Sequence, residues 1–120
     1  MNRFVAVLGA VIAVALLSLN EAHAATAQEN YRLYCVQCHG TTGNGQGINA
    51  DGLAVSARDH SSAAEMSKLT DEELRTAVAK GGEAVTKSEL MPPWAEVLRA
   101  EEIDDLVVHL RKLCKCMAAK

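Results

Sequence analysis

Residues 34–40 read YCVQCHG, and this pair of cysteines followed by a histidine constrains the fold more than any other feature of the chain. Two cysteines separated by two residues can form a thiol–disulfide redox site or supply half of a zinc site. With a histidine next, they can also attach a c-type haem. The rest of the sequence has to discriminate among these three alternatives.

The first 24 residues have the features of a signal peptide. Arg3 supplies a positive charge, residues 4–19 are uncharged and almost wholly apolar, and small residues at Ala22 and Ala24 suit a signal peptidase. The apolar run forms a helix of only about 24 Å, short of the roughly 30 Å hydrocarbon core, so an uncleaved membrane anchor is the weaker alternative. We expect cleavage after residue 24, export to the periplasm, and one domain over residues 25–120.

The expected mature chain has a small net charge and few aromatic side chains. Loss of Arg3 and Glu21 with the leader takes the basic and acidic counts from 12 and 15 to 11 and 14, so the net charge stays at −3. No basic face is present, which argues against nucleic-acid binding. The remaining aromatic residues are Tyr31, Tyr34 and Trp94. A domain this small and this poor in aromatics often needs a bound group to complete its core.

Two capping boxes predict where two helices begin. In such a box a threonine side chain and a glutamate three positions later bond to each other's backbone amides. Thr26 is the first residue of one box and Thr70 of the other, so we expect helices over residues 27–38 and 71–80. Two glycines after residue 80 end the second helix.

A third helix is predicted over residues 101–113, and the segments between the helices are predicted to be long loops. Its apolar residues recur at helical spacing on one stripe: Ile103, Leu106, Val107, Leu110 and Leu113. Four glycines within residues 40–47 break regular structure and allow close backbone approach to a flat ligand. No segment alternates with a period of two, so the predicted class is all-α.

The haem alternative explains more of the chain than the other two. A thioredoxin-type site needs a βαβ framework that the sequence does not predict. A zinc site needs a second pair of ligands at short spacing, and Cys114 and Cys116 are separated by a single residue. Two thiols at Cys35 and Cys38 can add to two vinyl groups of one porphyrin, while His39 reaches its iron. The porphyrin would also supply the missing centre of the core.

The chain resembles the mono-haem class I cytochromes c of the small bacterial type over nearly all of its expected mature length. The family's small and aromatic residues before the first cysteine correspond to Ala27 and Tyr31, its CxxCHG motif to residues 35–40, and its MPxW loop to residues 91–94. The resemblance implies a cytochrome c fold around one haem c held by two thioether bonds. It further implies a monomeric electron carrier in a respiratory chain, not an enzyme. Its partners would be a membrane or periplasmic electron donor and a terminal oxidoreductase.

The sequence departs from the family pattern at the last helix. His109 stands where the family commonly has an aromatic residue facing the first helix, and Arg99 and Ala100 replace the usual serine or threonine before the helix. These departures leave the contact between the first and last helices as an expectation for the structure to test.

The sixth iron ligand is predicted to be Met91, with the iron also held by His39. Pro92 restricts Met91 to extended conformations, so its thioether can be held rigidly. The resemblance implies the same ligand, because Met91 opens the MPxW loop. The other candidates downstream of the motif are Met66, His60, His109 and Met117, and we interpret both histidines as structural, His60 as a polar loop residue. An open or displaceable sixth position would instead indicate a haem enzyme, a gas-binding protein or a sensor.

The last two cysteines are not part of the family pattern. If the final helix continues through them, Cys114 lies on the apolar stripe and Cys116 about 200° further round, too far apart in direction for a disulfide. We therefore expect a buried Cys114 and an exposed, free Cys116. The alternatives are a local disulfide where the helix frays after Leu113, a metal site, or a dimer linked through Cys116.

Overall fold

The computed structural model describes residues 24–119, so the predicted leader lies outside the described residues apart from Ala24. Five α-helices and two short 3₁₀ turns form this part of the chain, and it contains no strand. The elements are α2 (Ala27–Tyr34), α3 (Val36–His39), η1 (Ala50–Gly52), α4 (Ala63–Met66), α5 (Asp71–Lys80), η2 (Glu83–Val85) and α6 (Ala100–Cys114). The predicted all-α class is confirmed. Within residues 24–119, no helix has the length and apolar character needed to cross a membrane.

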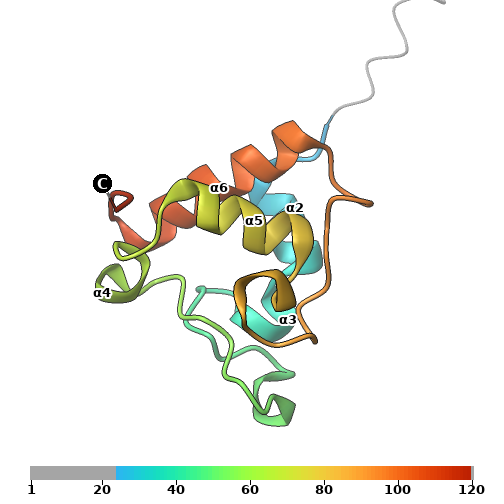
Figure 1. The fold of residues 1–120 in the computed structure, drawn as a ribbon, viewed down its shortest axis with the longest axis vertical. Helices are drawn as coiled ribbons and strands as arrows, with labels where there is room; N and C mark the ends of the chain where they lie inside the picture. The colour runs from blue at the N-terminus through green and yellow to red at the C-terminus, as the bar shows by residue number, and fades with distance from the viewer. Residues whose placement is uncertain (1–23, 120) are drawn as a thin grey trace, which may run out of the picture.

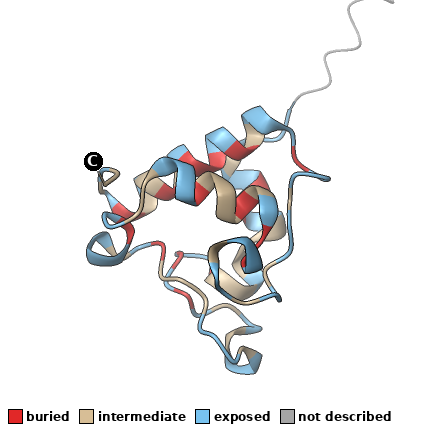
Figure 2. Ribbon diagram, viewed as in Figure 1, coloured by how far each residue is buried: buried red, intermediate tan, exposed pale blue. Residues whose placement is uncertain are grey.

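The core lies where α6 packs against α2 and α5 (Figure 1). Buried residues concentrate on the facing sides of these three helices, whereas the long loops are mostly exposed or half-buried (Figure 2). The predicted contact between the first and last helices is present, because the rings of Tyr31 and His109 lie 5.1 Å apart. His109 therefore takes the place of the expected aromatic residue. Asn30 adds a hydrogen bond from its side-chain amide to Glu102 across the same contact.

Both predicted capping boxes form. The Thr26 and Thr70 side chains accept from the amides of Glu29 and Glu73, and each glutamate accepts from its threonine amide in return. Each box satisfies backbone N–H groups that a helix start otherwise leaves without partners. Helix α5 consequently has the predicted bounds.

The first predicted helix is interrupted within the cysteine motif. Cys35 has φ −112° and ends α2, and α3 then begins at Val36. The amide of Cys35 still donates to the Tyr31 carbonyl, and the Cys35 carbonyl accepts from the His39 amide, so helical hydrogen bonding continues across the interruption. The prediction of one continuous helix over residues 27–38 was wrong at this residue.

Helix α6 begins without a side-chain cap from its N-cap residue. Arg99 has no side-chain acceptor, and instead the Glu102 carboxylate accepts from the Arg99 amide and from its guanidinium, at 3.0 and 3.2 Å. This arrangement is half of a capping box. It explains how the helix starts where the family's usual serine or threonine is missing.

The end of α6 confirms the expected burial of Cys114 but contradicts the expectation that Cys116 is free, and the alternative of a local disulfide is the one that forms. The helix stops at Cys114, Lys115 adopts a left-handed conformation with φ 51°, and Cys114 forms a disulfide with Cys116. The left-handed residue turns the chain back, so the two side chains no longer point to opposite sides. The expectation failed because it assumed that the helix continues through residue 116.

The glycine-rich loop packs directly against the helix that carries the cysteine motif. The amide of Gly47 donates to the Cys38 carbonyl at 3.0 Å, and a side chain at residue 47 would collide with the carbonyls of Val36 and Gln37. A collision with backbone cannot be relieved by a rotamer change. The loop must therefore stay glycine at this position to remain seated on α3.

Gly47→Ala is expected to lower the free energy of unfolding by about 1–3 kcal/mol, the usual cost of forcing extra atoms into a packed site. Gly52→Ala is the matched control, because a side chain there meets nothing within 4 Å. The control should change stability by less than about 1 kcal/mol. Denaturant titration of the two purified variants measures both values, and equal losses in the two variants would contradict the seating of the loop on α3.

Candidate functional site

The three predicted haem-attachment residues lie together in the wall of one large cavity. Cys35 ends α2, while Cys38 and His39 belong to α3, and all three line a cavity of about 650 Å³. Its volume falls in the range typical of small-molecule and cofactor sites. The cavity lies between α2 and α3 on one side and α5, α6 and the loops over residues 53–60 and 85–94 on the other.

The orientation of His39 suits a metal ligand. Its Nδ1 lies 3.0 Å from the carbonyl oxygen of Arg58, to which it can donate a hydrogen bond. Burial lowers the pKa of His39, so the ring is neutral near pH 7. With Nδ1 occupied by a carbonyl, Nε2 carries the free lone pair, which is the usual way in which a second residue orients a ligating histidine.

The environment of Cys35 favours a thioether over a thiolate. Burial, and then the neighbouring Cys38, raise the pKa of the Cys35 thiol to about 12. A redox-active thiol needs a lowered pKa, because the thiolate is the reactive form. A thioether carries no charge and tolerates burial, so the site fits covalent haem attachment better than thiol–disulfide exchange. The two sulfurs are not joined in the structure.

The zinc alternative finds no support in the described part of the chain. Nowhere within residues 24–119 do three or more histidine, cysteine, aspartate or glutamate side chains gather closely enough to hold a metal ion. A structural zinc site needs four such ligands.

Of the five candidate sixth ligands, only Met91 and His60 line the cavity. Met66 is 0% exposed and belongs to the helical core, His109 packs on Tyr31, and Met117 is 84% exposed at the C-terminal end. His60 stacks on His39 and therefore lies on the same side of the cavity as the first ligand. Met91 remains the predicted sixth ligand.

The loop that carries Met91 is fixed to the end of α5. The Met91 carbonyl accepts from the Gly82 amide at 2.9 Å, and Trp94 donates its amide to the Val78 carbonyl at 3.1 Å. The Trp94 ring also packs on Tyr34, with 4.9 Å between ring centroids. Met91 is thus tied to the segment that follows α5, and Trp94 to α5 and to Tyr34 of α2, which holds Met91 at the cavity wall.

His60 is a residue of this site whose burial the sequence did not indicate. It is 7% exposed, its ring stacks on His39 with centroids 4.0 Å apart, and its Nδ1 lies 3.0 Å from the Tyr31 hydroxyl. Burial, and then the nearby His39, lower its pKa well below the usual value, so it is neutral. His60 does lie in a loop, as interpreted, but the interpretation did not include its burial. It is a buried neighbour of the predicted iron ligand.

Comparison with known proteins agrees with the geometry of the site. One protein-family model matches residues 22–110, and that family is described as cytochrome c oxidase, cbb3-type, subunit III. A solved structure, the KustC0563 c-type cytochrome, is 29% identical to this chain and superimposes with a TM-score of 0.61. That alignment covers 74% of this chain and 98% of the solved one. No curated protein matches. The matched residues make up well over half of the sequence, so the chain belongs to the cbb3-type cytochrome c oxidase subunit III family of cytochrome c domains, and it is a small class I c-type cytochrome.

Proposed function

We propose that this protein carries single electrons in the periplasm on one haem c, attached through Cys35 and Cys38 and ligated by His39 and Met91. The observation that carries the proposal is the meeting of these four side chains at the wall of one cavity. When bound, a haem c supplies a reversible change between ferric and ferrous iron. The protein contributes the tether, the ligands and the exclusion of water.

The proposed ligand pair suits electron transfer rather than catalysis at the iron. With the imidazole of His39 and the thioether of Met91 both bound, the iron would have no position open for a substrate. A thioether ligand also raises the reduction potential. The Arg58 carbonyl fixes the imidazole of His39, and the anchored loop fixes Met91, so both ligands are held before and after each electron is taken up.

Carbon monoxide tests this proposal against the alternative of a haem enzyme, gas-binding protein or sensor. The reduced wild-type protein is expected not to bind carbon monoxide at neutral pH on mixing, because Met91 holds the sixth position. The variant Met91→Ala should bind it rapidly and stoichiometrically, which provides the positive control. Rapid stoichiometric binding by the wild-type protein would support the alternative function.

A second candidate is a small subunit held permanently in a larger complex. The description of the matched family, which names an oxidase subunit, favours this candidate. Size-exclusion chromatography of protein purified from its native cell distinguishes the two. A freely diffusing carrier should elute at the mass of the monomer, whereas a permanent subunit should elute with the complex.

Electron transfer is expected to depend on salt with the sign of a negatively charged carrier. Three acidic side chains line the cavity, Asp59, Glu65 and Glu73, against two basic ones, Arg58 and Lys87. Two haem propionates would add to the chain's own net charge of −3. Raising the ionic strength from about 10 to 150 mM shortens the Debye length from roughly 30 to 8 Å and screens attraction to a cationic partner.

The measurement is the rate constant of electron transfer to a small cationic reagent and to an anionic one. The first rate constant should fall as salt is added, and the second should rise. A rate constant with the cationic reagent that rises with salt would show that basic side chains control the exposed edge of the haem, contrary to the prediction.

A further inference from the structure

The disulfide at the end of α6 adds little to a turn that the backbone already holds. The Lys115 amide donates to the carbonyls of Arg111 and Lys112, and the Cys116 amide donates to the Arg111 carbonyl. A cross-link stabilises a fold mainly by restricting the unfolded chain, and the effect grows with the number of residues enclosed. Cys114 and Cys116 enclose one residue. This disulfide is therefore expected to contribute little to the stability of the fold.

The two sulfur atoms lie in different surroundings. Cys114 is 3% exposed and belongs to the apolar core, whereas Cys116 is half-buried at its edge. Attack on a disulfide requires access to one sulfur along the line of the bond. An external thiol therefore reaches Cys116 and not Cys114.

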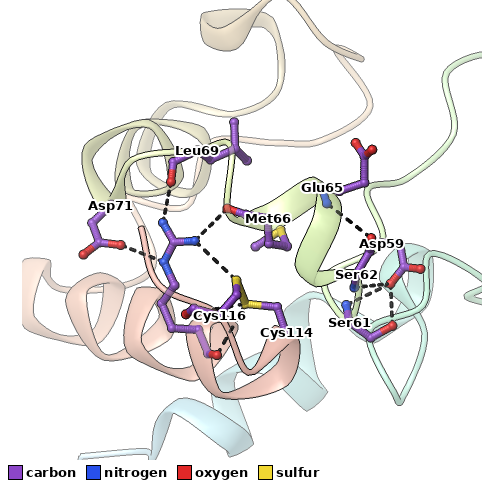
Figure 3. Close-up of a disulfide and its surroundings, with 10 residues drawn as sticks. Asp59, Ser61, Ser62, Glu65, Met66, Leu69, Asp71, Cys114 and Cys116 are labelled. Carbon is purple, nitrogen blue, oxygen red and sulfur yellow. Dashed lines mark hydrogen bonds and ion pairs between the residues drawn. A yellow bond between two sulfur atoms is a disulfide. The ribbon is translucent and has the colours of Figure 1, made fainter. Parts of the chain in front are cut away.

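A fixed positive charge lies beside the accessible sulfur. Nη1 of Arg111 is 3.8 Å from Sγ of Cys116, and Leu69 and Asp71, which Figure 3 shows near the disulfide, bind the same guanidinium. It donates to the carbonyls of Met66 and Leu69, both at 2.7 Å, and to the Asp71 carboxylate at 2.8 Å. A cation held this firmly does not move away when the charge of its neighbour changes. Such a cation favours the thiolate form of a nearby cysteine.

We propose that Cys114 and Cys116 form a second redox site, a thiol–disulfide exchange site whose partner is a protein dithiol. A disulfide with one accessible sulfur exchanges more readily than a fully buried one. The site is separate from the cavity, whose wall includes neither cysteine, and it does not depend on the proposed electron-carrier role.

The reaction transfers two electrons from the partner to the disulfide. One partner thiolate attacks Sγ of Cys116, the bond between Cys114 and Cys116 breaks, and Cys114 leaves as a thiolate that takes a proton from water. The second partner thiolate then attacks the partner's own sulfur in the mixed disulfide and releases the Cys116 thiolate beside Arg111. The partner is oxidised to a disulfide, and this chain is left with two reduced cysteines. In the reverse direction Cys116 is the nucleophile.

The first experiment uses the intact protein with its haem and dithiothreitol as the probe dithiol. Alkylation and mass spectrometry count the free thiols, while circular dichroism and the haem spectrum report the fold. We expect two thiols to appear with the fold unchanged and the haem spectrum that of the intact ferrous protein, because dithiothreitol also reduces the iron, and we expect the thiols to disappear again in oxidised glutathione. A disulfide that resists dithiothreitol until the protein is unfolded by denaturant would overturn the proposal.

The second experiment tests the roles of the two cysteines. Cys114→Ser leaves Cys116 as a free thiol, which should react rapidly with iodoacetamide, and Cys116→Ser leaves a Cys114 that should react slowly or not at all. Faster labelling of Cys114 than of Cys116 would overturn the assignment of the attacked sulfur.

The third experiment tests the role of Arg111 in the Cys114→Ser background. Arg111→Gln should slow alkylation of Cys116 at neutral pH by about 10-fold, the effect of a one-unit rise in the thiol pKa, and Arg111→Lys should restore most of the rate. Asp71→Asn is the matched control, because it contacts the same guanidinium but not the sulfur, and it should not slow the reaction. Equal rates in the glutamine and lysine variants, with circular dichroism unchanged, would contradict a role for the charge.

Discussion

A variant with both Cys35→Ala and Cys38→Ala is expected to lack stable tertiary structure. The reason lies in the distribution of buried apolar side chains: Tyr31, Met66, Leu74, Val78, Leu98, Ile103, Leu106, Val107, Leu110 and Cys114. None of them comes from residues 40–62 or 81–97, which surround the cavity of about 650 Å³. Without a group in the cavity these loops have no apolar interior to pack against, and a small domain cannot sustain so large a void.

Circular dichroism and a thermal scan of this variant measure the effect. We expect a weak helical signal and no cooperative transition, because the haem is lost together with its attachment. The matched control is the double variant Cys114→Ala and Cys116→Ala, which also removes two sulfur atoms but leaves the cavity residues intact. The control should keep its haem and unfold cooperatively. A cooperative transition in the first variant would contradict the view that the haem completes the core.

The helices could be predicted because their signals are local. Each capping box needs only a threonine and a glutamate three residues apart, and both boxes form as expected. The apolar stripe of the last helix likewise becomes its buried face. Such signals can be recognised without knowledge of the tertiary structure, because the interacting groups lie close together along one helix.

The ends of helices were predicted less well where no local signal marks them. Cys35 interrupts the first helix without a glycine or proline, and Lys115 adopts a left-handed conformation that is usually left to glycine. At Lys115 the Arg111 side chain binds carbonyls far away in sequence and the disulfide closes over it. The contacts of Arg111 are tertiary interactions that the sequence pattern does not indicate, whereas the local disulfide was one of the alternatives that the sequence left open.

The candidate site could be predicted in part. Cys35, Cys38 and His39 are adjacent in sequence, so their proximity needed no knowledge of the fold, whereas Met91 could be chosen only because a proline follows it and because the chain resembles a known family. The burial of His60 could not be predicted. Its surroundings are created by Tyr31 and His39, which belong to other segments of the chain.

The variant Met91→Ala is expected to lose the weak methionine-to-ferric-iron absorption band in the red and to have a lower reduction potential than the wild-type protein. The thioether stabilises ferrous iron relative to ferric iron, so its removal favours the ferric state. The loop itself should stay in place, because its anchors are the backbone bonds of Met91 and Trp94 to the end of α5 and not the Met91 side chain. Absorption spectroscopy of the oxidised protein and a redox titration provide the two measurements.

Met66→Ala is the control that separates ligation from stability. Met66 is 0% exposed, so its truncation should lower the free energy of unfolding by about 2–5 kcal/mol, the usual cost of a cavity left by a large core side chain. Because Met66 does not line the cavity, the absorption band and the potential should stay as in the wild-type protein. The reverse result, a band that survives in Met91→Ala and disappears in Met66→Ala, would mean that the sixth ligand comes from the helical core and that the loop after α5 serves only to close the cavity.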